Sequence, residues 1–220
     1  MKSDLRPYGR RAFLGIVAGG VAALVWGRPL QRVTARLSPV SAFFVTGGWR
    51  IYTVAATMPR FDQDRWRLRI DGLVEHPQEL TYRELLKLPQ ATQVSTFHCV
   101  TGWTVQNVHW QGVRFADLLA AAKPLPSAKA LTFVSAEEPY ADSLTLEQAL
   151  LPDVMLAHSM DGRPLTRPHG APARVVIPEM YGYKNVKWVG RIELTAAPAD
   201  GYWEVRGYDR DAYVGHSNGH

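Results

Sequence analysis

The spacing of apolar residues along the chain is mostly that of strands. Trp66, Leu68 and Ile70 alternate with arginines, which predicts a half-buried strand that ends at the Asp71-Gly72 turn. A stretch rich in β-branched residues over 92–97 predicts a second strand. Further strands are predicted over residues 131–135, 154–158, 174–177 and 187–194. The pattern therefore favours a domain built mainly on β-structure.

Short helices are predicted between these strands. Thr81 and Glu84 have the spacing of a capping box, and Thr145 and Gln148 repeat it. Apolar residues at helical spacing predict an amphipathic helix over residues 114–122. Because the helices are too few and too short for repeated crossovers, we expect an α+β domain rather than a βαβ array. A Rossmann fold is excluded, since no glycine-rich turn joins a strand to a helix.

Length and charge limit the possible functions. A chain of 220 residues with 46% hydrophobic residues is long enough for one domain with a sizeable core. The formal net charge is +5, but residues 1–36 contain seven of the 25 Lys and Arg residues and only one of the 20 acidic residues. The remaining chain is close to neutral, which argues against nucleic-acid binding.

Residues 1–36 have the form of an export signal. Arg10 and Arg11 precede Phe13-Leu14 and a short apolar run, whereas a membrane-spanning helix needs about 20 apolar residues. The paired arginines predict twin-arginine export to the periplasm, a route that carries proteins folded around a cofactor loaded in the cytoplasm. Cleavage after Ala35 and retention as a membrane anchor both remain open, as does an anchoring or amphipathic helix with a chance arginine pair.

Cys99 is the only cysteine, so it cannot form an internal disulfide. It follows the strand predicted over 92–97 and precedes a polar, glycine-containing loop. A free cysteine is often a small buried hydrophobic residue. At the end of a strand, however, its thiolate is also placed to bind a transition metal or to act as a nucleophile.

A second candidate site lies in residues 163–191, where six basic residues accompany a single acidic residue, Glu179. The basic residues are Arg163, Arg167, Arg174, Lys184, Lys187 and Arg191. Such a cluster is either a solvated face or a site for an anion. Arg174 begins a predicted strand and Lys187 precedes Trp188, so both are tied to the core, which favours an anionic ligand such as a phosphate.

Three stretches resemble the sulfite-oxidase family of molybdenum enzymes. The sequences HGAPARVVIP (169–178) and YGYKNVKWV (181–189) are similar to its pterin-binding signature, and His98-Cys99-Val100 is similar to its molybdenum-ligand motif. The similarity runs from Phe43 to Tyr208.

The resemblance implies a domain organisation and a fold. We expect a twin-arginine signal segment at 1–36, a molybdopterin-binding oxidoreductase domain at 43–208 and a C-terminal tail at 209–220. The implied fold is the mixed-sheet, sulfite-oxidase-type α+β domain without the C-terminal immunoglobulin-like dimerisation domain.

The resemblance also implies one Mo-molybdopterin per chain, with the Cys99 thiolate as the protein ligand to molybdenum. Tyr208, five residues after Trp203, matches the spacing of the family's active-site tyrosine and joins Cys99 as a candidate catalytic residue. The implied pterin and phosphate contacts are Ser135, His169, Arg174, Asn185, Val186 and Lys187.

Departures from the family concern the substrate. Thr46 stands where sulfite oxidases have an arginine, and no arginine lies between Cys99 and Arg114, which argues against sulfite. The cysteine loop is more similar to that of the periplasmic methionine-sulfoxide reductase catalytic subunits, although Thr101 replaces an acid often found there. We expect oxygen-atom transfer on methionine sulfoxide or a small sulfur or nitrogen oxide.

Electrons must come from or go to another protein. One cysteine cannot hold an iron–sulfur cluster, and the chain lacks the Cys-x-x-Cys-His motif of c-type haem attachment. A monomeric catalytic subunit with a membrane haem subunit or a soluble cytochrome as partner is expected.

Two rival functions remain: a metal-free exported module that binds an anion, and a thiol enzyme with Cys99 as nucleophile. Neither rival accounts for twin-arginine export.

Overall fold

The computed structural model describes residues 41–46 and 48–216, so the predicted signal segment lies outside the described residues. The strands are β1 (Ser41–Thr46), β2 (Trp49–Thr53), β3 (Arg67–Gly72), β4 (Gln78–Thr81), β5 (Ala91–Cys99), β6 (Trp103–Arg114), β7 (Ala130–Ser135), β8 (Ala141–Thr145), β9 (Met155–Met160), β10 (Arg163–Pro164), β11 (Arg174–Val176) and β12 (Val189–Thr195). The helices are α2 (Tyr82–Leu85), α3 (Phe115–Ala120) and α4 (Leu146–Ala149), with 3₁₀ turns at Arg167–His169 and Glu204–Arg206.

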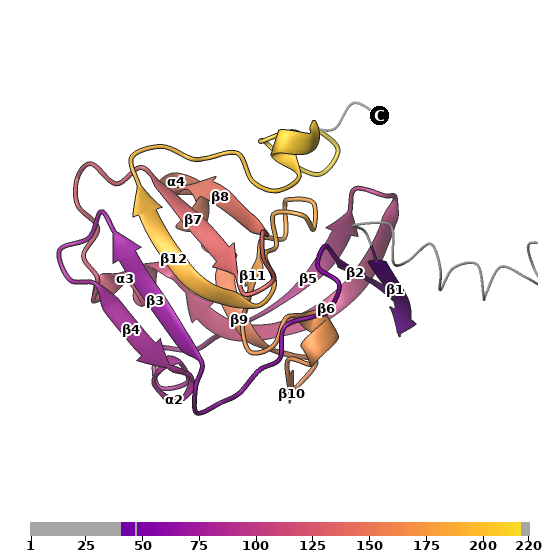
Figure 1. Ribbon diagram of the computed structural model, residues 1–220, viewed down its shortest axis with the longest axis horizontal. Coiled ribbons are helices and arrows are strands. Elements are labelled where there is room, and N and C mark those ends of the chain that lie inside the picture. The colour runs from indigo at the N-terminus through magenta and orange to yellow at the C-terminus, as the bar shows by residue number, and fades with distance from the viewer. Residues whose placement is uncertain (1–40, 47, 217–220) are drawn as a thin grey trace, which may run out of the picture.

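Two five-stranded sheets form the body of the molecule (Figure 1). One has the order β4-β3-β12-β7-β8; the other has the order β10-β9-β6-β5, with β11 also paired to β9. Strands β12 and β3 run parallel, and the remaining pairs among the described strands are antiparallel. The predicted mixed-sheet α+β fold is therefore confirmed.

The main core lies between the two sheets because each presents an apolar face to the other. Leu68 and Ile70 of β3 are fully buried, whereas the arginines that alternate with them are exposed, as the sequence pattern predicts. They belong to one cluster with Phe133 of β7 and with Val113 and Leu156 from the other sheet. Burial of these side chains supplies the dominant favourable term in folding.

Strand β6 was not predicted from the sequence, although it is 12 residues long. Apolar residues occupy every second position up to Val105, and the same spacing starts again at Val108, one position out of step. Asn107, between the two stretches, has a φ of 55°. The pairing with β5 shifts register at the same place, which is a β-bulge. After the bulge, each residue faces the side of the sheet opposite to the one that the alternation before it predicts. The sequence therefore does not show the two-residue period of one continuous strand.

The helices are short, and their boundaries agree with the sequence at the N-terminal ends. Both predicted capping boxes are present, at Thr81 with Glu84 and at Thr145 with Gln148. The strand predicted from residue 187 begins at Val189 instead, because Trp188 has a φ of 52°, which an extended strand does not allow. Strand β3 ends at Gly72, whose φ is 86°, so the strand end predicted at residues 71–72 is confirmed.

Residues beyond Tyr208, the predicted end of the domain, also pack against it. Ala212 is fully buried, its carbonyl accepts a hydrogen bond from the Tyr181 amide at 2.8 Å, and Met180 and Tyr213 form an isolated bridge.

Among the described residues, no helix is long and apolar enough to cross a membrane.

A glycine on β6 allows the closest approach of β9. A Cβ atom on Gly112 would lie 2.2 Å from the Leu156 carbonyl oxygen and 2.6 Å from the Ala157 Cα. Gly112→Ala is therefore expected to lower the free energy of unfolding by about 2 kcal/mol, because backbone must move. Gly190→Ala is the control, since nothing lies within 4 Å of its Cβ position. Equal urea-unfolding midpoints for the two variants would contradict this account.

Candidate functional site

A cavity of about 200 Å³ opens where β2, the β5–β6 hairpin and the segments around residues 182–187 and 203–208 meet. Eight of the 21 residues that line it are aromatic: Trp49, Tyr52, Phe97, Trp103, Tyr140, Tyr183, Trp203 and Tyr208. The ionisable and polar residues on the wall include Arg50, Cys99, Glu137, Arg174, Asn185 and Lys187. Residues far apart in sequence thus converge on one enclosed, mostly apolar space.

Cys99 is the last residue of β5 and pairs with Trp103, the first residue of β6. A tight turn joins the two strands: Gly102, at a φ of 84°, donates its amide to the Cys99 carbonyl at 3.0 Å. The thiol lines the cavity, with its sulfur 3.2 Å from Thr101 Oγ1. The predicted position of Cys99 at a strand end beside a cavity is therefore confirmed.

Arg174 is a buried cation without a carboxylate partner among the described residues. Its side chain is 3% exposed, and its guanidinium donates hydrogen bonds of 3.3 Å to the carbonyls of His169 and Asn185. The rings of Trp110 and Phe97 lie beneath it, with centroids 5.3 Å and 5.6 Å away. Burial lowers the pKa of Arg174 to about 10. A buried charge balanced only by dipoles and ring faces favours an anionic ligand.

Lys187 is the second cation on the wall. Its amino group donates to the Tyr52 carbonyl at 2.6 Å and lies 4.0 Å from the centroid of the Trp188 ring. Burial lowers the pKa of Lys187, the nearby Arg174 lowers it further, and Glu137 opposes the change. Gly170 leaves room for the lysine stem, because a Cβ there would lie 2.8 Å from the Lys187 Cβ.

Glu137 lines the same cavity and was not identified from the sequence. Its Oε1 accepts hydrogen bonds from the amides of Val54 at 2.8 Å and Ala55 at 3.2 Å, and from the Thr53 hydroxyl. Burial raises the pKa of Glu137, although these amides and Lys187 oppose the change. The contact joins segments more than 80 residues apart, which no local pattern could indicate.

The other predicted pterin contacts have different positions. Asn185 lines the cavity, and its Oδ1 accepts the Ile177 amide at 2.8 Å. Val186 is buried in the main core, and neither it nor Ser135 lines the cavity. The Ser135 hydroxyl donates to the Lys187 carbonyl at 2.8 Å and accepts from the Glu137 amide at 2.9 Å, so it positions two residues of the wall.

His169 is buried behind the wall rather than on it. Its ring packs edge-on against Trp49 at 5.1 Å, and its Nδ1 has no hydrogen-bond partner in the described part of the chain. Burial lowers the pKa of His169 to about 4, and the charges of Arg174 and Lys187 add to the effect. The histidine is therefore neutral at physiological pH.

The cluster of six basic residues separates into different environments. Only Arg174 and Lys187 reach the cavity. Lys184 and Arg191 form ion pairs with acidic residues, and Arg167 donates to backbone carbonyls, one of them Pro59 at 3.0 Å. Of the six basic residues, the two that reach the cavity are therefore Arg174 and Lys187, the two for which the sequence favoured an anionic ligand.

Tyr208 shares the cavity wall with Cys99. Its ring packs against Trp203 at 5.1 Å and Tyr183 at 5.3 Å. The 3₁₀ turn that precedes it ends at Gly207, with a φ of 95°. The structure therefore brings five predicted site residues to one cavity wall, Cys99, Arg174, Asn185, Lys187 and Tyr208, although they come from three separate parts of the chain.

This arrangement defines an α+β domain with a thiol, the buried cation Arg174 and the partly buried cation Lys187 around one aromatic cavity, as a site for an anionic cofactor requires. The family model for the oxidoreductase molybdopterin binding domain matches residues 55–203. The chain belongs to this family of molybdopterin-binding oxidoreductases, which confirms the resemblance to the sulfite-oxidase type.

Three similar proteins differ in how much of their length is matched. Uncharacterized oxidoreductase YuiH of Bacillus subtilis is 36% identical over 67% of this chain and 74% of its own length. The protein-methionine-sulfoxide reductase catalytic subunit MsrP of Campylobacter jejuni is 30% identical over 66% of this chain and 54% of MsrP. The sulfane dehydrogenase SoxCD from Paracoccus pantotrophus has a TM-score of 0.64 and 27% identity, over 72% of this chain and 45% of the SoxCD chain. The chain thus spans about half the length of MsrP.

The residues present fit the cofactor that the family implies. The thiol of Cys99 suits a transition metal, and Arg174 and Lys187 lack ion-pair partners among the described residues. The indole Nε1 of Trp103, also on the wall, is buried without a hydrogen-bond partner in the same described region. The guanidinium of Arg174 and the indole N–H of Trp103 are costly to bury unless a polar ligand contacts them.

The low pKa of His169 predicts a stability effect. The folded value of about 4 lies below the usual value of 6.5, so below pH 6.5 the unfolded chain binds a proton that the folded protein refuses. Stability is therefore lost as the pH falls from about 6.5 to about 4. His169→Gln should reduce the loss between pH 7 and pH 5 by about 1–2 kcal/mol in urea unfolding. The exposed His109→Gln serves as control, and an unchanged loss in the His169 variant would refute the assignment.

Proposed function

We propose that this protein is an exported Mo-molybdopterin oxidoreductase that transfers an oxygen atom to or from a sulfoxide or a similar small oxide. One observation carries the proposal: the thiol of Cys99 and the unpaired, buried guanidinium of Arg174 line the same cavity. A thiolate supplies a metal ligand, and a desolvated cation supplies a site for a phosphate. The two rival functions, a metal-free anion-binding module and a thiol enzyme, each use only one of these two features.

The residues on the wall then have distinct roles. Cys99 binds the metal, while Arg174 and Lys187 hold the anionic end of the pterin cofactor, with one such group per chain. Asn185 contributes its amide group, and Ser135 and His169 support the cofactor side of the wall from behind. When bound, the group supplies a metal that exchanges an oxygen atom and two electrons with the substrate.

The aromatic part of the cavity wall suits a substrate of low charge. Trp203, Tyr208 and Trp103 present aromatic surface, and Arg50 is the one further cation on the described wall. In this proposal the Tyr208 hydroxyl donates a hydrogen bond to a sulfoxide oxygen. The similarity to MsrP, whose name specifies methionine sulfoxide, supports this substrate class over sulfite.

Reduction of a sulfoxide consumes two electrons and two protons and releases water. The electrons come from an external haem protein, either a membrane subunit or a soluble cytochrome, because the chain has a single cysteine. We place the protein in the periplasm after twin-arginine export, as a monomeric catalytic subunit, on the evidence of the arginine pair at residues 10–11.

The cofactor assignment is tested by elemental analysis for molybdenum and by pterin fluorescence after oxidation. Protein from a molybdate-fed host should contain about one molybdenum per chain, and Cys99→Ala should lose the metal or all activity with methionine sulfoxide and an artificial electron donor. Thr104→Ala, an exposed change on the neighbouring strand, is the matched control. Absence of both metal and pterin from exported wild-type protein would leave an anion-binding module as the better account.

If Arg174 binds the cofactor, replacing it should weaken cofactor binding without lowering the stability of the cofactor-free protein. Arg174→Met removes an unpaired buried charge, so the stability of the cofactor-free protein should not fall. Pterin retained through purification should fall at least about tenfold, since a hydrogen bond to a charged group is lost. Arg191→Met, on a paired arginine outside the cavity, should retain normal pterin content. Normal pterin content in the Arg174 variant would exclude it from the cofactor site.

A further inference from the structure

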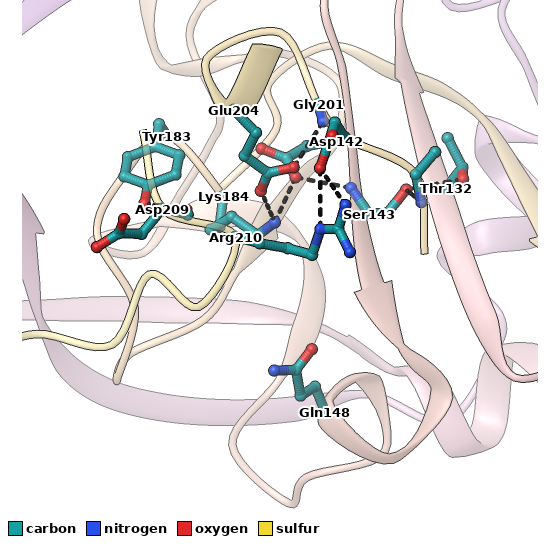
Figure 2. A network of polar contacts seen from close by, with 12 residues as sticks. Thr132, Asp142, Ser143, Gln148, Tyr183, Lys184, Gly201, Glu204, Asp209 and Arg210 are labelled. Atoms are coloured by element: carbon teal, nitrogen blue, oxygen red, sulfur yellow. Dashed lines mark hydrogen bonds and ion pairs between the residues drawn. The ribbon is translucent and has the colours of Figure 1, made fainter. Parts of the chain in front are cut away.

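Behind the aromatic wall lies a cluster of three buried charged residues. The amino group of Lys184 bonds to Asp142 Oδ1 at 2.6 Å and to Glu204 Oε1, and Figure 2 shows it between the two carboxylates. The side chains of Lys184, Asp142 and Glu204 are only 2%, 1% and 2% exposed. They come from the segment after β11, from β8 and from the 3₁₀ turn near the C-terminus.

Both carboxylates are fixed by further hydrogen bonds from the backbone. Asp142 Oδ1 accepts the Ser143 amide at 2.7 Å, and Glu204 Oε2 accepts the Gly201 amide at 2.6 Å. Gly201 is required for this approach, because a Cβ there would lie 2.7 Å from Asp142 Cγ. The cluster therefore attaches the start of the C-terminal segment to the edge strand β8.

Two of the three charged residues, Lys184 and Glu204, are sequence neighbours of cavity-lining residues. Tyr183 and Asn185 flank Lys184 in sequence, and Trp203 directly precedes Glu204. Tyr208 lies four residues after Glu204, and its ring contacts Tyr183. The cluster thus connects the cofactor side of the wall to the segment that carries Trp203 and Tyr208.

Energetics argue that stability alone does not require such a cluster. Taking three charges out of water is costly, and apolar residues of similar volume often stabilise a fold as well or better. Burial raises the pKa of Asp142 to about 7, with Lys184 opposing and Glu204 adding to the change, which reflects the cost of two carboxylates around one cation. The ion cluster does, however, impose a geometry that apolar contacts would not specify.

We propose that Lys184, Asp142 and Glu204 form a positioning unit that holds the 201–208 segment, and with it Trp203 and Tyr208, against the cavity. The catalytic role of Tyr208 rests on the proposed function, but the claim that the three charged residues hold the 201–208 segment against the cavity does not. Asp142 is held in a sheet strand, so loss of the unit moves the C-terminal segment rather than β8.

Hydrogen exchange measured by mass spectrometry tests the positional claim directly. Glu204→Ala removes the bonds to Lys184 and Gly201 and should raise exchange in peptides covering residues 201–208 about tenfold, with exchange in β7 and β12 unchanged. Glu204→Gln keeps one acceptor oxygen, which can accept from Lys184 or from the Gly201 amide but not replace both bonds, and should restore part of the protection. Val205→Ala alters a side chain that is 65% exposed in the same turn and should have no effect.

Lys184→Met provides a second test, because it leaves two buried carboxylates without a cation and should release the segment at least as strongly as Glu204→Ala. Unchanged exchange at 201–208 in Glu204→Ala, equal exchange in Glu204→Ala and Glu204→Gln, or an equal rise across β7 and β12 would each overturn the proposal. Molybdenum content is measured on the same preparations. A protein without molybdenum would refute the proposed function, while the exchange pattern would still decide the role of the cluster.

Discussion

Charges removed from water without full compensation are the constraint around which this site is organised. The guanidinium of Arg174 is buried against aromatic rings and backbone carbonyls, with no carboxylate to neutralise it among the described residues. A fold retains such an arrangement only where the rest of the structure, or a ligand, offsets its cost. The two-sheet core of β3, β7, β6 and β9 supplies the stability, and the cavity supplies a place for an anion.

Compensated and uncompensated charges have different functions in this molecule. Lys184 is as deeply buried as Arg174, but two carboxylates surround it, so it connects segments of the protein and does not need a ligand. Arg174 and Lys187 face the cavity without ion pairs in the described region and are available to a ligand. This distinction separates a binding site from a structural cluster, although all three residues lie within 14 positions of one another.

The aromatic wall links binding to the choice of substrate. The Tyr208 ring contacts both Trp203 and Tyr183. Hydrogen bonds fix this part of the wall: Tyr140 Oη donates to the Tyr183 carbonyl at 2.6 Å, and Tyr183 Oη donates to the Asp209 carbonyl at 2.7 Å. Rigid aromatic surface excludes water from the reacting atoms and favours a substrate of low charge. The family membership implies a molybdopterin cofactor, and the aromatic side chains support the proposed class of substrate.

Local sequence patterns determined the elements that depend on neighbouring residues. The alternation at Leu68 and Ile70, the capping boxes at Thr81 and Thr145 and the position of Cys99 at a strand end were all predictable, because each depends on a period or on contacts within a few residues. The bulge at Asn107 was not, since one extra residue reverses the faces of a strand. The tertiary structure alone decided which of six cations reach the cavity, that Glu137 joins them, and that Ser135 lies behind the wall. These outcomes depend on contacts between segments tens of residues apart, whose geometry is set by the packing of the two sheets.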